Sequence, residues 1–188
     1  MSRPLCPRCE RPLAACLCAW VRSVSNRVEV LLLQHPDEQG EAKGTAALLR
    51  LSLSNCVLKV GERFDPSELD DGRQSWLLYP GADAGAALPL PERMRLIVLD
   101  GSWRKSRKLI HLNPWLTALP RLSLADAPAS RYASLRRADA AGQLSTLEAT
   151  TLALMQLEQG NAAPYQGLLE AMDGFVAQQL AFRPTAAH

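Results

Sequence analysis

Residues 96–109 of this sequence, LIVLDGSWRKSRKL, combine an apolar run with residue types that could do chemistry. Asp100 follows the apolar run, Trp103 comes three residues later, and four cations follow within the next five residues. A core strand needs neither the carboxylate nor the cations. A carboxylate at the tip of a strand can be partly desolvated and can act as a base or a hydrogen-bond acceptor. We therefore interpret the stretch as part of a small-molecule site that opens onto a polyanion.

Each of these residues also has a purely structural interpretation. Asp100 could cap a helix that starts near Ser102, for which Ser102 itself is a plausible N-cap. Trp103 could stack on a nucleobase or an adenine, or it could anchor the helix in the core. The cations at 104, 105, 107 and 108 wrap most of a helix, so they cannot all face one ligand, although several could meet RNA phosphates.

A second chemical pattern lies near the N-terminus, where four of the five cysteines are spaced C-x2-C-x6-C-x-C: Cys6, Cys9, Cys16 and Cys18. Four thiolates can close a tetrahedral site around zinc and leave no open position, which favours a structural role. The alternatives are two disulfides or an iron–sulfur cluster. We expect a zinc-binding segment over residues 1–24, followed by one main domain over residues 25–188. Cys56 is interpreted as a lone buried thiol.

The charge is unevenly distributed, although the whole chain carries only +2. Eight Lys or Arg residues and a single acidic residue lie between positions 101 and 137, so the rest of the chain is acidic. This basic face favours a partner with a phosphate backbone, and a solvated helix with scattered arginines is the alternative. No apolar run resembles a signal peptide or a membrane span, so we expect a cytoplasmic protein with reduced thiols.

The hydrophobic pattern predicts an α/β domain with a mostly parallel sheet covered by helices on both faces. The expected strands are residues 27–36, 56–61, 75–81, 95–101 and 121–124, and the expected helices are residues 40–55, 102–112, 144–160 and 165–182. In such sheets ligands bind beyond the carboxyl ends of the strands. The loops QHPDE, LYPG and LDGSW follow strand ends and could converge on one pocket.

Several segments, in order, resemble the DTW-domain family: the cysteine cluster, LLQHPDE, KGTAALLRLSL, LLYPG, LDGSWRKSRKL, NPWL, LPRLSL, SRYASLRR and LSTLEAT. Ser102 stands where the family motif Asp-x-Thr-Trp has threonine, and both offer a hydroxyl. The resemblance implies a tRNA-uridine aminocarboxypropyltransferase that moves the 3-amino-3-carboxypropyl group of S-adenosylmethionine to uridine N3, at position 47 in bacterial members. It also implies kinship with small-subunit rRNA aminocarboxypropyltransferases and a SPOUT-like fold with a C-terminal trefoil knot.

The resemblance and the motifs together assign candidate site residues. The catalytic candidates are Asp100, Ser102 and Trp103. The cofactor-binding candidates are Leu78, Tyr79, Pro80, Gly81, Leu99, Ser145, Thr146 and Glu148. The substrate-binding candidates are His35, Glu38, Arg104, Lys105, Lys108, Arg131, Tyr132, Arg136 and Arg137. Plain helix capping could equally explain the three residues at the start of the 144–160 helix, and a surface pair could explain His35 and Glu38.

Two other functions remain open at this point. The absence of a Gly-x-Gly-x-x-Gly motif after a strand disfavours a Rossmann methyltransferase, but a SPOUT methyltransferase would use the same donor. A noncatalytic zinc-ribbon RNA-binding protein is the alternative from another class. The expected partner is tRNA, with neither membrane nor DNA, and the pattern gives no oligomeric state.

Overall fold

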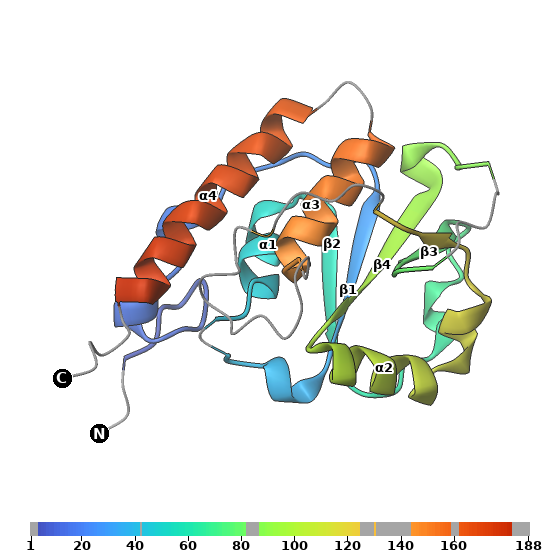
Figure 1. Cartoon of the computed structure of the whole chain (residues 1–188), viewed down its shortest axis with the longest axis horizontal. Helices are drawn as coiled ribbons and strands as arrows, with labels where there is room; N and C mark the ends of the chain where they lie inside the picture. Colours follow the sequence, from blue (N-terminus) through green and yellow to red (C-terminus); the bar gives the residue numbers. More distant parts are fainter. Residues whose placement is uncertain are drawn as a thin grey trace.

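The computed structural model describes residues 4–41, 43–81, 87–124, 130, 144–158 and 162–181. Five parallel strands form one sheet in the order β2-β1-β4-β3-β5 (Figure 1). The strands are β1 Glu29–Gln34, β2 Cys56–Val60, β3 Gln74–Leu78, β4 Met94–Asp100 and β5 Arg121–Leu122. The predicted α/β class and parallel sheet are therefore confirmed, with every expected strand present.

Helices cover both faces of this sheet because successive strand residues point to opposite sides. On one face, Val30 and Leu32 of β1 belong to the main core with α1, α3 and α4 (Figure 1). On the other face, Leu31 and Leu33 pack in a smaller core with Leu116 and with the partly buried Ile110 of α2. All six residues of β1 are buried, which is expected for a central strand of a parallel sheet.

The helices are α1 Ala46–Ser52, α2 Trp103–Leu112, α3 Thr146–Leu157 and α4 Ala162–Ala181. The helix predicted over residues 40–55 is wrong in its extent, because α1 begins only at Ala46. Gly40 adopts a φ of +73°, and the Arg11 side chain donates hydrogen bonds to the Glu41 and Gly44 carbonyls, so the preceding segment is held as a loop. The sequence pattern could not reveal that distant arginine.

The strand order creates a topological switch point between β1 and β4. After β1 the chain passes through α1 to β2 on one side, whereas after β4 it passes through α2 to β5 on the other side. Ligands of open α/β sheets bind outside the carboxyl ends of strands at such a point. The register places Gln34 directly opposite Asp100 there. The Asp100 carbonyl also accepts a hydrogen bond from the His35 amide, at 3.1 Å.

The N-terminal segment packs against α4 rather than standing apart. Trp20 donates a hydrogen bond from Nε1 to Gln178, whose own Nε2 donates to the Cys16 carbonyl, at 2.6 and 3.0 Å. Gly174 makes room for this contact, since a Cβ there would lie 2.0 Å from the Trp20 ring. Cys6 and Cys9 belong to the same core as β1 and α4. The boundary at residue 24 remains a prediction.

Two further expectations concern the whole chain. Within the part of the chain that the structure describes, every helix is too short or too polar to span a bilayer. The SPOUT-like topology and the trefoil knot remain predictions, since residues 125–129 and 131–143 lie outside the described residues.

Candidate functional site

The Asp100 carboxylate is held at the switch point by donors from two other elements. It is only 5% exposed. Gln34 of β1 donates from Nε2 to Oδ2 at 2.7 Å, and Thr146 of α3 donates from Oγ1 to Oδ1 at 2.6 Å. Hydrogen bonds to a charged carboxylate favour that charged form and fix its orientation. Three segments that are far apart in the sequence therefore converge on one buried acid.

Asp100 is not the cap of α2, so that structural alternative is wrong. The N-cap is Ser102, whose side chain accepts a hydrogen bond from the Lys105 amide at 3.4 Å. Gly101 lets the helix start so close to the strand, because a Cβ there would lie 3.0 Å from the Lys105 Cβ. The sequence Asp-Gly-Ser thus separates two roles: the carboxylate belongs to the sheet edge, and the hydroxyl belongs to the helix.

The start of α3 is closed by a capping box. Ser145 accepts a hydrogen bond from the Glu148 amide at 3.2 Å, and the Glu148 carboxylate accepts one from the Ser145 amide at 2.8 Å. Ser130 also donates to Glu148, at 2.9 Å. Capping therefore accounts for Ser145 and Glu148, whereas Thr146 is the residue of this turn that contacts Asp100.

An aromatic and cationic cluster lies near the switch point, where Tyr79 follows β3, Trp103 begins α2 and Arg121 begins β5. The rings of Tyr79 and Trp103 meet edge to face, with centroids 5.7 Å apart. The Arg121 guanidinium lies 5.5 Å from the Tyr79 centroid and donates to the Pro80 carbonyl at 3.1 Å. Trp103 is 40% exposed, so it is not a core anchor for α2. An exposed indole braced by a second ring is suited to stacking on a nucleobase.

The cations of α2 fall into two groups with different electrostatic surroundings. Lys105 pairs with Glu38 at 2.8 Å and Lys108 pairs with Glu62 at 2.6 Å, so the charges of both lysines are already compensated. Lys108 is the main cause of a lowered pKa of the Glu62 carboxyl. Arg104 and Arg107 are exposed, and neither side chain has a partner among the residues that the structure describes. These two arginines are available to an external anion.

His35 occupies a buried position between acids at the same sheet edge. It is 3% exposed, and its Nδ1 accepts a hydrogen bond from the Asp37 amide at 3.2 Å. Its Nε2 lies 3.1 Å from a Glu62 carboxylate oxygen, which also receives Lys108. The predicted substrate residues His35 and Glu38 therefore lie close to α2 but are engaged within the protein.

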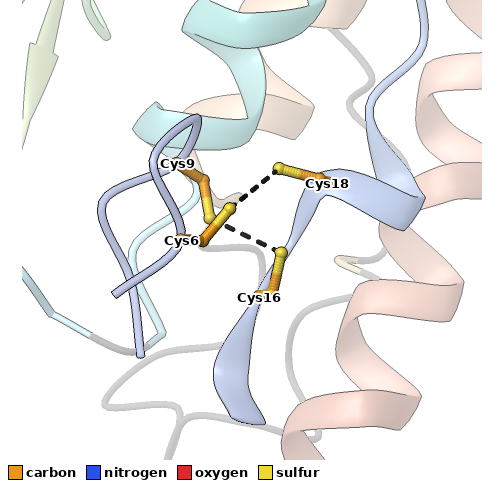
Figure 2. Close-up of side chains that lie close together, drawn as sticks. All are labelled: Cys6, Cys9, Cys16 and Cys18. Carbon is orange, nitrogen blue, oxygen red and sulfur yellow. Dashed lines mark hydrogen bonds between the residues drawn. The ribbon is translucent and has the colours of Figure 1, made fainter. Parts of the chain in front are cut away.

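The four N-terminal cysteines form a cluster with the dimensions of a tetrahedral thiolate site (Figure 2). Their sulfur atoms lie within 4.8 Å of one another, and the pairs Cys6–Cys18 and Cys9–Cys16 are each separated by 3.8 Å. Zinc–sulfur bonds of about 2.3 Å give a tetrahedron edge of about 3.8 Å. A disulfide would need about 2.05 Å, so these are free thiols. The cluster could bind a metal such as zinc.

The local backbone supports this interpretation of the cysteine cluster. Glu10 adopts a φ of +57°, which closes a tight turn after Cys9, and its amide donates to the Cys6 carbonyl at 2.8 Å. Hydrogen bonds from the amides of Cys9 and Arg8 lower the pKa of the Cys6 thiol to about 6. Burial and the neighbouring sulfurs raise the pKa of the Cys18 thiol to about 12. A cation bound among the four sulfurs would favour their thiolate forms.

The DTW domain model matches residues 3–180 of this chain. The chain belongs to the DTW domain family. It is 31% identical over 173 residues to the tRNA-uridine aminocarboxypropyltransferase 2 of Drosophila melanogaster, covering 83% of this chain and 67% of that protein. It is 31% identical over 195 residues to the protein of the same name in Mus musculus, covering 95% of this chain and 64% of the relative.

A plant relative is more distant. The tRNA-uridine aminocarboxypropyltransferase A of Arabidopsis thaliana is 24% identical over 133 residues, covering 57% of this chain and half of that protein. This DTW chain thus spans about two thirds of the animal relatives' length or less. No solved structure matches it significantly.

The structure of this DTW domain brings most of the predicted site residues to one edge of the sheet. Leu78 ends β3, and Leu99 precedes Asp100, the last residue of β4; both leucines are partly buried. The exposed Pro80 and Gly81 follow β3. Arg131, Tyr132, Arg136 and Arg137 lie outside the described residues, so their assignment remains a prediction.

Three residues of this edge were not among the named site candidates, namely Gln34, Glu62 and Arg121, although Gln34 begins the predicted pocket loop QHPDE and Arg121 lies in the basic segment 101–137. Gln34 was detectable in principle, because it is the one polar residue that ends the apolar run VLLLQ. Glu62 gave no such signal, since a charged residue in a loop is common, and the basic segment did not single out Arg121. Cys56 is half-buried rather than fully buried, and desolvation raises the pKa of its thiol to about 12.

Proposed function

We propose that this protein is a tRNA-uridine aminocarboxypropyltransferase that uses S-adenosylmethionine as donor and modifies N3 of a tRNA uridine, at position 47 of the variable loop. The observation that carries the proposal is the buried Asp100 carboxylate, held by Gln34 and Thr146 at the switch point of the sheet. The family membership and the names of the relatives supply the reaction class.

In the proposed reaction a bond forms between uridine N3 and the γ-carbon of the aminocarboxypropyl group. The bond between that carbon and the sulfonium sulfur breaks, methylthioadenosine leaves, and the N3 proton must be accepted. A carboxylate within hydrogen-bond reach can accept this proton as the new bond forms. Asp100 is our candidate, because its orientation is fixed from both sides before a substrate arrives. Most of the rate would come from aligning the correct carbon with N3.

We assign the residues around Asp100 to two further functions, binding of S-adenosylmethionine and binding of RNA. We assign donor binding to the loop after β3 and to Leu99, with Thr146 contributing through its contact with Asp100. We assign the RNA to the exposed side of α2, where Trp103 can stack on a base and Arg104 and Arg107 can meet phosphates. Lys105 and Lys108 are better suited to positioning the acidic loops than to holding RNA, because both are already paired.

We also propose that the metal at Cys6, Cys9, Cys16 and Cys18 is zinc in a structural role. The sulfur spacing fits a tetrahedral ion, and four thiolate ligands leave no position for a substrate or water.

The products of the reaction test the proposed function. Purified protein is incubated with S-adenosylmethionine and unmodified tRNA, and the small-molecule product and the tRNA nucleosides are identified by mass spectrometry. We expect methylthioadenosine together with a uridine that has gained the aminocarboxypropyl mass. S-adenosylhomocysteine and a methylated nucleoside would replace the proposal with the SPOUT methyltransferase. Tight tRNA binding without any S-adenosylmethionine binding would favour the noncatalytic RNA-binding protein.

A further inference from the structure

Arg11 is a buried cation whose backbone lies beside the cysteine cluster and whose guanidinium contacts the loop after β1. It lies between the first and second cysteine pairs and is only 6% exposed. Its carbonyl accepts a hydrogen bond from the Cys6 amide at 2.7 Å. Its backbone therefore closes the turn of residues 6–11, which we call the cysteine turn. Its guanidinium lies 5.6 Å from the centroid of the Phe175 ring on α4.

The Arg11 guanidinium holds the loop that follows β1. Its Nη2 donates to the Gly44 carbonyl at 2.6 Å and to the Glu41 carbonyl at 3.3 Å. The Gly44 amide itself donates to the Glu41 carbonyl at 2.9 Å, which makes this a tight turn around one guanidinium. A buried, charged donor makes strong hydrogen bonds. Replacing Arg11 would therefore remove a strong hydrogen bond from the Gly44 carbonyl.

The same loop leads directly to the Asp100 site. Thr45 follows Gly44, is 4% exposed, and accepts a hydrogen bond on Oγ1 from the Leu147 amide at 3.3 Å. Leu147 lies next to Thr146, the α3 residue that donates to Asp100. The cysteine turn, the loop after β1 and the first turn of α3 are therefore connected by contacts between neighbouring residues.

We propose that Arg11 is a positioning residue through which the metal-binding segment helps to shape the S-adenosylmethionine site. The metal would hold the cysteine turn, Arg11 would transmit that position to Glu41 and Gly44, and the adjacent Thr45 would set the turn of α3 that carries Thr146. The N-terminal segment therefore serves S-adenosylmethionine binding and is not a separate RNA-binding module. This inference rests on the proposed function only for the identity of the donor.

Arg11→Met and two control variants test the proposal in metal-loaded protein of the complete chain. Arg11→Met removes the hydrogen bonds from the guanidinium to the Glu41 and Gly44 carbonyls but keeps an apolar side chain against Phe175. Gln178→Met removes the hydrogen bonds that attach Trp20 and Cys16 to α4 and leaves the bonds from Arg11 to the loop in place. Arg11→Lys retains the charge and can restore one of the bonds to the loop.

Three quantities are measured for each variant: metal per chain, amide hydrogen exchange, and the Kd values for S-adenosylmethionine and tRNA. We expect Arg11→Met to keep its metal, to speed exchange of the Gly44 and Leu147 amides about tenfold or more, and to weaken S-adenosylmethionine binding by about tenfold. The tRNA Kd should stay within about twofold. Arg11→Lys should recover part of both effects, and Gln178→Met should leave both close to wild type.

Equal losses in Arg11→Met and Gln178→Met would overturn the proposal, because they would indicate general destabilisation of the segment. Weakened tRNA binding with unchanged S-adenosylmethionine binding would overturn it as well, and would make the segment an RNA contact. Wild-type protein that binds no S-adenosylmethionine would defeat the proposed function instead. The exchange measurement needs no ligand, so unchanged Gly44 and Leu147 amides in Arg11→Met would still reject the positioning role.

Discussion

Replacing Asp100 by Asn is the most direct perturbation of the proposed chemistry. The Asn side chain has nearly the same shape, and its Oδ1 can accept the Gln34 bond. Its amide then faces Thr146, whose hydroxyl can turn to accept instead of donate. Both hydrogen bonds can therefore persist in neutral form, and the folded structure should persist with them.

The expected cost to stability follows from the change in charge. Hydrogen bonds to a charged group contribute about 1.5–3 kcal/mol, against about 0.5–1.5 kcal/mol for neutral ones. We expect Asp100→Asn to lower the free energy of unfolding by about 1–2 kcal/mol, which is a few degrees in Tm for a chain of this size. The loss of turnover should be much larger, roughly 10²–10⁴-fold, as is typical of a positioned acid–base group.

The assay follows methylthioadenosine and the modified nucleoside at saturating S-adenosylmethionine and tRNA, alongside thermal unfolding. Glu29→Gln is the matched control. Glu29 lies at the opposite end of β1, where Arg95 donates a hydrogen bond to its carboxylate in a buried ion pair. This control should lose stability to a similar or larger degree and keep its turnover. Near-normal turnover of Asp100→Asn would refute the catalytic role and leave Asp100 as a structural acceptor.

Three further predictions can be checked with simple measurements. Elemental analysis of reduced wild-type protein should find about one zinc ion per chain. Cys9→Ser should lose most of that metal. A metal-free wild-type protein would refute the site. Replacing Arg104 and Arg107 by Ala should lower the slope of log K for tRNA against log salt by about one unit per lost phosphate contact, whereas Lys105→Ala, whose charge pairs with Glu38, should change it much less. Desolvation raises the pKa of the Cys56 thiol to about 12, so little thiolate should be present at pH 8. Iodoacetamide should therefore alkylate Cys56 at least about a hundredfold more slowly in the folded protein than after denaturation. Equal rates would contradict this desolvation.

Local features of the sequence were sufficient for the cysteine cluster and for most of the secondary structure, although not for the start of α1. Buried strands of a parallel sheet are continuous apolar runs, so β1 and β4 were evident without any knowledge of their neighbours. Helix starts are also local, and Ser102 caps α2 while Ser145 and Glu148 form the capping box of α3. The four cysteines lie within thirteen residues, so their short loops already confined the sulfurs to one place.

The site itself depends on contacts between residues that are far apart in the chain, and only the tertiary structure decided these. The sheet order puts β4 beside β1, and the register puts Gln34 opposite Asp100. No local pattern encodes either choice, because any apolar strand can pair with another at several registers. The same holds for charge: the sequence showed a cationic helix, but the fold neutralised Lys105 with Glu38 and left Arg104 exposed. A cation is available to a ligand only if no acidic side chain of the protein pairs with it. The acids that pair with the α2 lysines, Glu38 and Glu62, follow β1 and β2 and come close to α2 only in the folded structure.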